Sequence, residues 1–172
     1  VAALAGRHDI LYYARENHAS LYDAARLSYA TLRKYEHGDL SDLRRLLQAD
    51  AGKPGGRIIV TDGVFSMSGH IADLPGIVKL KKQFGARLLV DDAHASGVRG
   101  EHGRGTGEHF GLEDEVDVIV GTFSKSFASV GGFMAGDREV VNFVKHHARP
   151  FTFPAALPAM QMAAALEALK IM

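Results

Sequence analysis

The chain contains no cysteine, no excess of either charge and no long hydrophobic run. The lack of cysteine excludes a disulfide framework, a thiolate zinc site and a cysteine nucleophile. Because 20 basic side chains balance 20 acidic ones, composition gives no reason to expect a nucleic acid or a membrane surface as partner. No apolar run approaches the ~18 residues of a membrane span, and no signal-like segment is present. We therefore expect a cytoplasmic protein without a membrane span.

What is present suits one compact unit. The chain has 172 residues, of which 47% are hydrophobic, and this length allows a sizeable core within one domain. It opens on Val1 inside an apolar stretch and stops within a helical pattern, without a cap or a breaker. We therefore expect residues 1–172 to be a fragment, truncated at both ends.

Short apolar runs alternate with longer amphipathic ones. The runs that predict strands are 10–13, 32–35, 57–61, 87–91, 116–121 and 132–135, and the helical patterns cover 19–28, 41–50, 73–84, 138–147 and 158–172. Asp73 followed by Pro75 is typical of a helix start, and Gly85 of a helix end. Alternation of this kind predicts an α/β fold, with a mostly parallel sheet flanked by helices.

Lys125 and Asp91 form the most informative pair of residues. Asp91 closes the strand-like run RLLVD, and Lys125 lies in GTFSKSF, just past the next predicted strand. Ligands of open α/β sheets collect at the carboxyl ends of the strands, where both side chains would point. A carboxylate opposite a pyridine nitrogen keeps that nitrogen protonated, and a lysine amine captures an aldehyde. The pair predicts a pyridoxal phosphate site.

Two histidines are candidates for the same site. His18, in NHAS, lies between a predicted strand and a predicted helix, where its ring could stack on the cofactor. His94 lies three residues past Asp91, where it could reach the phenolic oxygen of the cofactor. An ordinary helix-start residue and an ordinary loop histidine are the alternatives.

Three hydroxyl side chains are candidates for binding the cofactor. Thr122 and Ser124 flank Lys125, and we expect them to be phosphate donors or ordinary caps beside a helix start. Ser66 follows the predicted strand 57–61 and could bring a hydroxyl to the same edge of the sheet.

Two competing motifs lie in EHGRGTGEH. The glycines of this run fail the GxGxxG spacing, and we expect a loop that does not open a helix after a strand. The histidines and glutamates, namely Glu101, His102, Glu108 and His109, match no zinc pattern, so we expect no metal. No GxSxG elbow or P-loop is present.

Taken together, five blocks in order resemble the α-oxoamine synthase family of fold-type-I pyridoxal phosphate enzymes: NHAS, TDGVFSMSG, VDDAH, GEHGRGTGEHFG and GTFSKSFASVGGF. The last block is most similar to the serine palmitoyltransferase branch. The resemblance implies a single, partial cofactor-binding large domain over 1–172, without the upstream phosphate loop and the small C-terminal domain of the family.

The resemblance also implies roles for individual residues. Lys125 matches the Schiff-base lysine, Asp91 the pyridinium partner, His94 the phenolic-oxygen partner and His18 the stacking histidine. Thr122 matches a threonine that binds the cofactor's phosphate, and Ser66 matches a serine near the cofactor. The chain also departs from the family at two places. Asp62 stands where relatives often have glutamate. Pro154 and Ala155 stand where relatives tend to place a serine or threonine that contacts the neighbouring subunit's phosphate.

The implied activity condenses serine, alanine or glycine with an acyl-CoA, with decarboxylation, to an α-amino ketone, in a homodimer. Serine palmitoyltransferase-like chemistry is favoured, and 8-amino-7-oxononanoate synthase and 2-amino-3-ketobutyrate CoA ligase chemistry are alternatives within the family. Outside it, the alternatives are another fold-type-I aminotransferase or lyase, and an inactive fragment or partner subunit.

Overall fold

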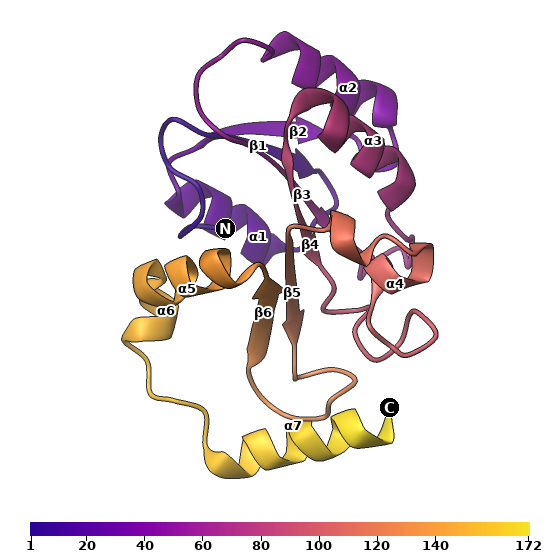
Figure 1. Ribbon diagram of the computed structural model, residues 1–172, viewed down its shortest axis with the longest axis vertical. Helices are drawn as coiled ribbons and strands as arrows, with labels where there is room; N and C mark the ends of the chain where they lie inside the picture. Colours follow the sequence, from indigo (N-terminus) through magenta and orange to yellow (C-terminus); the bar gives the residue numbers. More distant parts are fainter.

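A single six-stranded sheet organises the chain (Figure 1). This computed structural model describes all residues 1–172. The strands are β1 (Ile10–Ala14), β2 (Thr31–Tyr35), β3 (Arg57–Asp62), β4 (Arg87–Asp91), β5 (Val118–Thr122) and β6 (Gly132–Gly136). Their order across the sheet is β2-β1-β3-β4-β5-β6, with β1 to β5 parallel and β6 antiparallel to β5. The predicted α/β fold with a mostly parallel sheet is therefore confirmed.

Helices cover both faces of this sheet (Figure 1). One face carries α2 (Leu40–Ala49) and α3 (Leu74–Phe84), and the other carries α1 (Ala19–Leu27) and α5 (Arg138–His147). The remaining helical segments are α4 (Thr106–Phe110), a 3₁₀ turn at Glu113–Glu115, α6 (Arg149–Thr152) and α7 (Ala159–Ile171). Because helices cover both faces of the sheet, a ligand can reach it only at the edge where the parallel strands end and the loops begin.

Two apolar clusters make up the core, one on each face. Leu88 and Val90 of β4 point to the side of α2 and α3, whereas Leu89 points to the side of α1. All three residues have 1% or less of their surface exposed. Since side chains alternate along a strand, both faces of β4 must be apolar, which explains its unbroken hydrophobic run.

The predicted elements agree with the structure to within two residues at each end. Helix α3 starts as predicted, because the Asp73 carboxylate accepts a hydrogen bond from the Gly76 N–H. It ends at Gly85, which adopts the left-handed conformation with φ of 61°. Two short helices, α4 and α6, were not predicted, and the expectation of a plain loop over the glycine-rich run was wrong, since Gly105 is the N-cap of α4.

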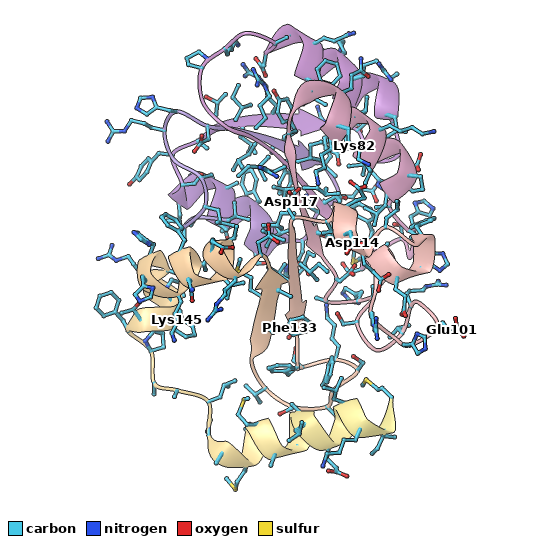
Figure 2. The ribbon with its side chains drawn as sticks, viewed as in Figure 1. Lys82, Glu101, Asp114, Asp117, Phe133 and Lys145 are labelled. Atoms are coloured by element: carbon cyan, nitrogen blue, oxygen red, sulfur yellow. The ribbon has the colours of Figure 1, made fainter.

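Asp117, labelled in Figure 2, contacts both α3 and β4 just before the start of β5. Its carboxylate accepts the backbone N–H of Leu88 at 2.8 Å and pairs with Lys81 Nζ of α3 at 2.7 Å. Burial alone would raise the pKa of Asp117, but the hydrogen bonds from Lys81 and Leu88 outweigh it, and the pKa is lowered. The bond from Leu88 holds the start of β5 beside β4, where Leu89 pairs with Val118, and the ion pair joins this point to α3.

None of the helices combines the length and the apolar composition that crossing a lipid bilayer requires.

Candidate active site

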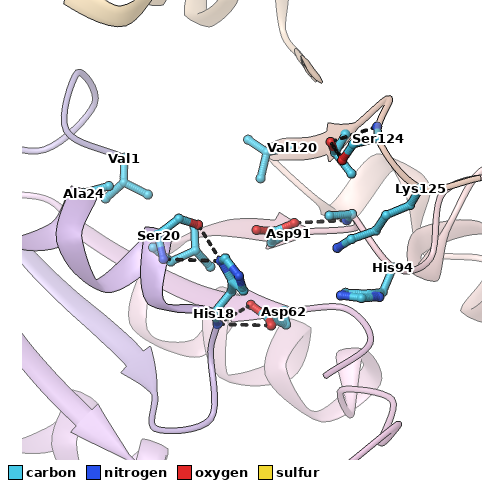
Figure 3. A pocket seen from close by; sticks show the side chains of 14 residues that line it. Val1, His18, Ser20, Ala24, Asp62, Asp91, His94, Val120, Ser124 and Lys125 are labelled. Atoms are coloured by element: carbon cyan, nitrogen blue, oxygen red, sulfur yellow. Dashed lines mark hydrogen bonds between the residues drawn. The ribbon is translucent and has the colours of Figure 1, made fainter. Parts of the chain in front are cut away.

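A cavity of about 520 Å³ opens at the carboxyl ends of β1, β3, β4 and β5. The polar side chains that line it stand at the last residues of β3, β4 and β5, in the loops that follow β4 and β5, and at the start of α1: His18, Ser20, Asp62, Asp91, His94, Thr122, Ser124 and Lys125. Figure 3 shows the side chains of Lys125, His94, Asp91, Asp62 and His18 directed toward one another across this space. The structure thus brings together six of the seven residues expected at the site.

Asp91 is the last residue of β4. One oxygen of its carboxylate accepts the Ala93 N–H at 3.0 Å, and no protein group bonds to the other. In the sheet Asp91 pairs with Asp62 of β3, and paired residues of neighbouring strands carry their side chains on the same face. Two carboxylates therefore stand side by side at the rim of the cavity.

Lys125 follows β5 by three residues, and its amine makes no ion pair. Burial lowers the pKa of Lys125, although the negative charges of Asp91 and Asp62 act in the opposite direction. A larger neutral fraction makes the amine a better nucleophile toward a carbonyl carbon.

The loop that carries Lys125 is held at several points. The Thr122 hydroxyl donates to the Gly131 carbonyl at 3.0 Å, and the Ser126 hydroxyl donates to the Ser96 carbonyl at 2.6 Å. No helix begins in this loop, so the expected helix start beside Lys125 was wrong. Instead of capping, the hydroxyls of Thr122 and Ser124 lie 2.7 Å apart at the wall of the cavity.

His18 is the N-cap of α1. Its Nδ1 accepts the Ser20 N–H at 3.3 Å and lies 2.8 Å from the Ser20 hydroxyl, while the ring faces the cavity. His18 therefore both caps α1 and lines the cavity, so the two interpretations of this residue are compatible.

His94 lies beside Lys125 in Figure 3. Burial and the positive charge of Lys125 lower the pKa of His94, with Asp91 opposing them. The imidazole is therefore held toward its neutral form, in which one ring nitrogen accepts a hydrogen bond.

Asp62 is the residue whose importance the sequence did not reveal. It is 2% exposed, and both carboxylate oxygens lie 3.2 Å from the backbone nitrogen of His18. Burial raises the pKa of Asp62 to about 7, helped by Asp91 and opposed by the His18 N–H and Lys125. A carboxyl that titrates near neutrality, in a cavity with an amine, is typical of functional sites.

Two further buried residues support the site. The Asn17 side chain donates to the Val60 carbonyl at 2.8 Å and accepts the Asp62 N–H at 2.9 Å, which fixes the end of β3. Asp92 is fully buried and accepts hydrogen bonds from the backbone and the hydroxyl of Thr106. Both lie within the NHAS and VDDAH blocks, beside residues that the sequence did single out.

Ser66, which we expect near the cofactor, is the one of the expected site residues that does not line the cavity. The chain turns sharply after β3: Phe65 is buried, and its N–H donates to the His70 carbonyl at 2.9 Å. Ser66 therefore lies on the exposed side of this turn.

Comparison with known proteins gives the family. The family model "Aminotransferase class I and II" matches residues 1–172. The chain belongs to this family.

Within the aminotransferase class I and II family, the relatives carry two names. A serine palmitoyltransferase of Sphingobacterium spiritivorum is 48% identical over 172 residues, which is 100% of this chain and 43% of the relative. An 8-amino-7-oxononanoate synthase of Thermoanaerobacter pseudethanolicus is 46% identical over 172 residues, 100% of this chain and 44% of the relative. Both names belong to the α-oxoamine synthase group, so the resemblance seen in the sequence is confirmed.

Solved structures agree with these relatives. A serine palmitoyltransferase from S. paucimobilis with a bound PLP–myriocin aldimine superposes with a TM-score of 0.93 at 36% identity, over 98% of this chain and 42% of that one. An 8-amino-7-oxononanoate synthase from Francisella tularensis gives a TM-score of 0.83 at 33% identity, over 99% of this chain and 48% of that one. The chain thus spans less than half the length of these family members.

Proposed function

We propose that residues 1–172 are the central part of the cofactor-binding large domain of a pyridoxal phosphate-dependent acyltransferase. The reaction condenses an amino acid, either serine, alanine or glycine, with an acyl-CoA, and releases free CoA and carbon dioxide to leave an α-amino ketone. The observation that supports it best is the amine of Lys125 and the carboxylate of Asp91 facing one cavity of about 520 Å³.

The residues of the cavity fit pyridoxal phosphate. Asp91 has a carboxylate oxygen free to accept a hydrogen bond from a protonated pyridine nitrogen. Thr122 and Ser124 offer hydroxyls to a phosphate, and the ring of His18 faces the cavity from the side of α1. When bound, the cofactor supplies an aldehyde carbon and an electron-withdrawing ring.

The protein side chains then hold and move protons. The Lys125 amine, with its lowered pKa, takes the proton from the α-carbon of the amino acid as a general base. Asp91 keeps the ring nitrogen protonated by its negative charge, and the His94 imidazole accepts or donates a hydrogen bond at the phenolic oxygen. Asp62 holds the backbone of His18 in place, which orients the stacking ring.

We favour serine palmitoyltransferase-like chemistry within this group. It is supported by the higher TM-score of the serine palmitoyltransferase structure, 0.93 against 0.83, although the identities of 48% and 46% nearly match. The 8-amino-7-oxononanoate synthase and 2-amino-3-ketobutyrate CoA ligase reactions are the alternatives. A homodimer in the cytoplasm belongs to the same proposal.

The test is to supply the full-length protein, loaded with pyridoxal phosphate, with each amino acid and with short and long acyl-CoA thioesters. Release of free CoA that depends on both substrates, with an α-amino ketone as product, is expected. Long acyl chains with serine would support the favoured reaction, and short ones with alanine or glycine its alternatives. Conversion of the amino acid to a keto acid without CoA release would overturn the acyltransferase proposal in favour of an aminotransferase.

A further inference from the structure

Outside the cavity, three potential metal ligands meet at the same edge of the sheet. They are Glu16, His37 and His70, whose ligand atoms all lie within 4.8 Å of one another. They follow β1, β2 and β3 respectively, and these three strands are neighbours in the order β2-β1-β3. Parallel strands therefore bring together residues that are far apart in the sequence.

Two histidines and a glutamate are a ligand set that zinc prefers. Zinc binds imidazole nitrogen and carboxylate oxygen at about 2.0 to 2.2 Å, and His₂Glu with an added water completes a tetrahedral site. At these bond lengths the ligands of one ion lie about 3.4 Å apart. Glu16 and His70 are exposed, so their side chains have room to rotate from the observed spacing toward that of bound ligands.

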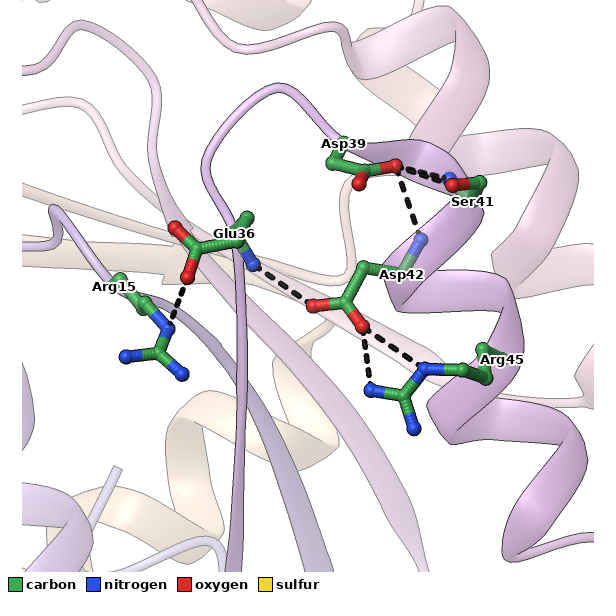
Figure 4. Close-up of polar contacts among 6 residues, drawn as sticks. All are labelled: Arg15, Glu36, Asp39, Ser41, Asp42 and Arg45. Atoms are coloured by element: carbon green, nitrogen blue, oxygen red, sulfur yellow. Dashed lines mark hydrogen bonds and ion pairs between the residues drawn. The ribbon is translucent and has the colours of Figure 1, made fainter.

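The backbone around two of these ligands is fixed. Arg15 and Glu36, which precede Glu16 and His37, form an ion pair of 2.7 Å. Figure 4 shows that the Glu36 N–H also donates to the Asp42 carboxylate at the start of α2, at 3.1 Å. The ends of β1 and β2 are thus tied together immediately before the two ligands.

The third ligand is held by the turn after β3. Phe65 N–H donates to the His70 carbonyl at 2.9 Å, and the flanking Val64 and Ile71 form an antiparallel bridge. The His37 ring packs against buried Phe65 with 3.9 Å between centroids. These contacts set the positions of His37 and His70 relative to each other.

Neighbouring groups also orient the ligands. The Ser68 hydroxyl donates to the Glu16 carboxylate at 3.4 Å, a contact of the kind that directs ligating carboxylates. The rings of His37 and His70 lie nearly parallel, 15° apart and 5.4 Å between centroids. To bind an ion they must turn until one nitrogen lone pair of each points at it.

We propose that Glu16, His37 and His70 bind a divalent transition-metal ion of the zinc type and that this ion clamps the ends of β2, β1 and β3. No other group of three such ligands meets elsewhere in the chain, and His102 has Glu108 alone as partner, at 2.7 Å. Because Glu16 lies two residues before His18, the clamp also stiffens the wall of the cavity.

The experiment titrates ZnCl₂ into the full-length protein loaded with pyridoxal phosphate and measures binding by isothermal titration calorimetry. The variants are His70→Ala and Glu16→Gln, with His102→Ala as the matched control, because His102 also has a glutamate partner. We expect one zinc ion per chain. Both variants should lower the affinity for zinc at least about 10-fold, because losing even a residue that only supports a metal ligand lowers affinity by that much. The His102→Ala control should bind zinc as tightly as the wild type does.

Equal zinc binding by the wild type and both variants would overturn the proposal, as would an equal loss in the His102→Ala control. Circular dichroism of each variant without zinc shows whether it is folded, and His70→Gln replaces His70→Ala if that variant is not. The readout needs no catalytic activity, so failure of the acyltransferase proposal leaves this test intact.

Discussion

Both oxygens of the Asp62 carboxylate lie 3.2 Å from the backbone nitrogen of His18, which links the end of β3 to the N-cap of α1. The carboxylate is 2% exposed, and its burial without a cationic partner raises its pKa from 3.8 to about 7. The Asp62 carboxyl therefore changes its charge near neutral pH, in the same cavity that Lys125 and Asp91 line.

This shift predicts how stability depends on pH. Because the folded state binds the Asp62 proton more tightly than the unfolded state, the free energy of unfolding falls as the pH rises from 3.8 to about 7. The difference in pKa corresponds to a loss of about 4 kcal/mol at the most. Asp62→Asn, which cannot ionise, should flatten this slope in urea titrations of the cofactor-free protein, and an unchanged slope would contradict the assignment.

Lys125→Ala should remove the visible absorbance band of lysine-bound pyridoxal phosphate. The reason is that Lys125 has the one lysine amine that lines the cavity. Lys79→Ala, on the exposed side of α3, is the matched control and should keep the band. Absorbance spectra of the three purified full-length proteins decide this, and a band that persists in Lys125→Ala would reject the site.

Asp91→Asn should leave the cofactor bound but reduce kcat by at least about 100-fold, the scale of removing one electrostatic partner from an active site. An amide carries no negative charge and cannot keep the ring nitrogen protonated. Asp114→Asn, on the exposed 3₁₀ turn, is the control. Equal kcat values for Asp91→Asn and the wild type would show that another group faces the ring nitrogen.

Thr106→Val should destabilise the fold by about 2 to 3 kcal/mol, because it removes a hydrogen bond from the fully buried carboxylate of Asp92. Valine keeps the shape of the side chain, so packing changes little. Thr152→Val on the exposed α6 should cost far less, and guanidinium denaturation measures both. A free energy of unfolding that is equal in the two variants would mean that Asp92 finds another donor.

The sequence predicted the sheet well because its signals are local. Leu88, Leu89 and Val90 form an apolar run that only a strand buried on both faces would need, and Asp73 and Gly85 mark the ends of α3. Lys125 and Asp91 could be placed at one edge, since Asp91 ends one strand of the parallel sheet and Lys125 follows another.

The rest depends on contacts between distant segments. The pKa of Asp62 is set by burial under a loop from β1, 44 residues away in the chain, and no local pattern reports that distance. Ser66 does not line the cavity, since the chain turns at Phe65, shortly after the strand, and no local pattern reports that turn. Thr122 and Ser124 were expected to lie beside a helix start, but no helix begins there. The Thr122 hydroxyl bonds to the Gly131 carbonyl of the same hairpin, and the Ser126 hydroxyl bonds to the Ser96 carbonyl, 30 residues away in the chain.

The antiparallel pairing of β6 with β5 has a consequence for engineering this protein. Lys125 lies in a hairpin whose two arms are locked in register from Val118 and Gly136 to Thr122 and Gly132. Lengthening or shortening the segment between Phe123 and Gly131 would disturb the position of the amine relative to Asp91, whereas no residue of the exposed AGKPGG connection before β3 lines the cavity. To keep the amine in place, a tag or sensor is better inserted in that connection than in the hairpin.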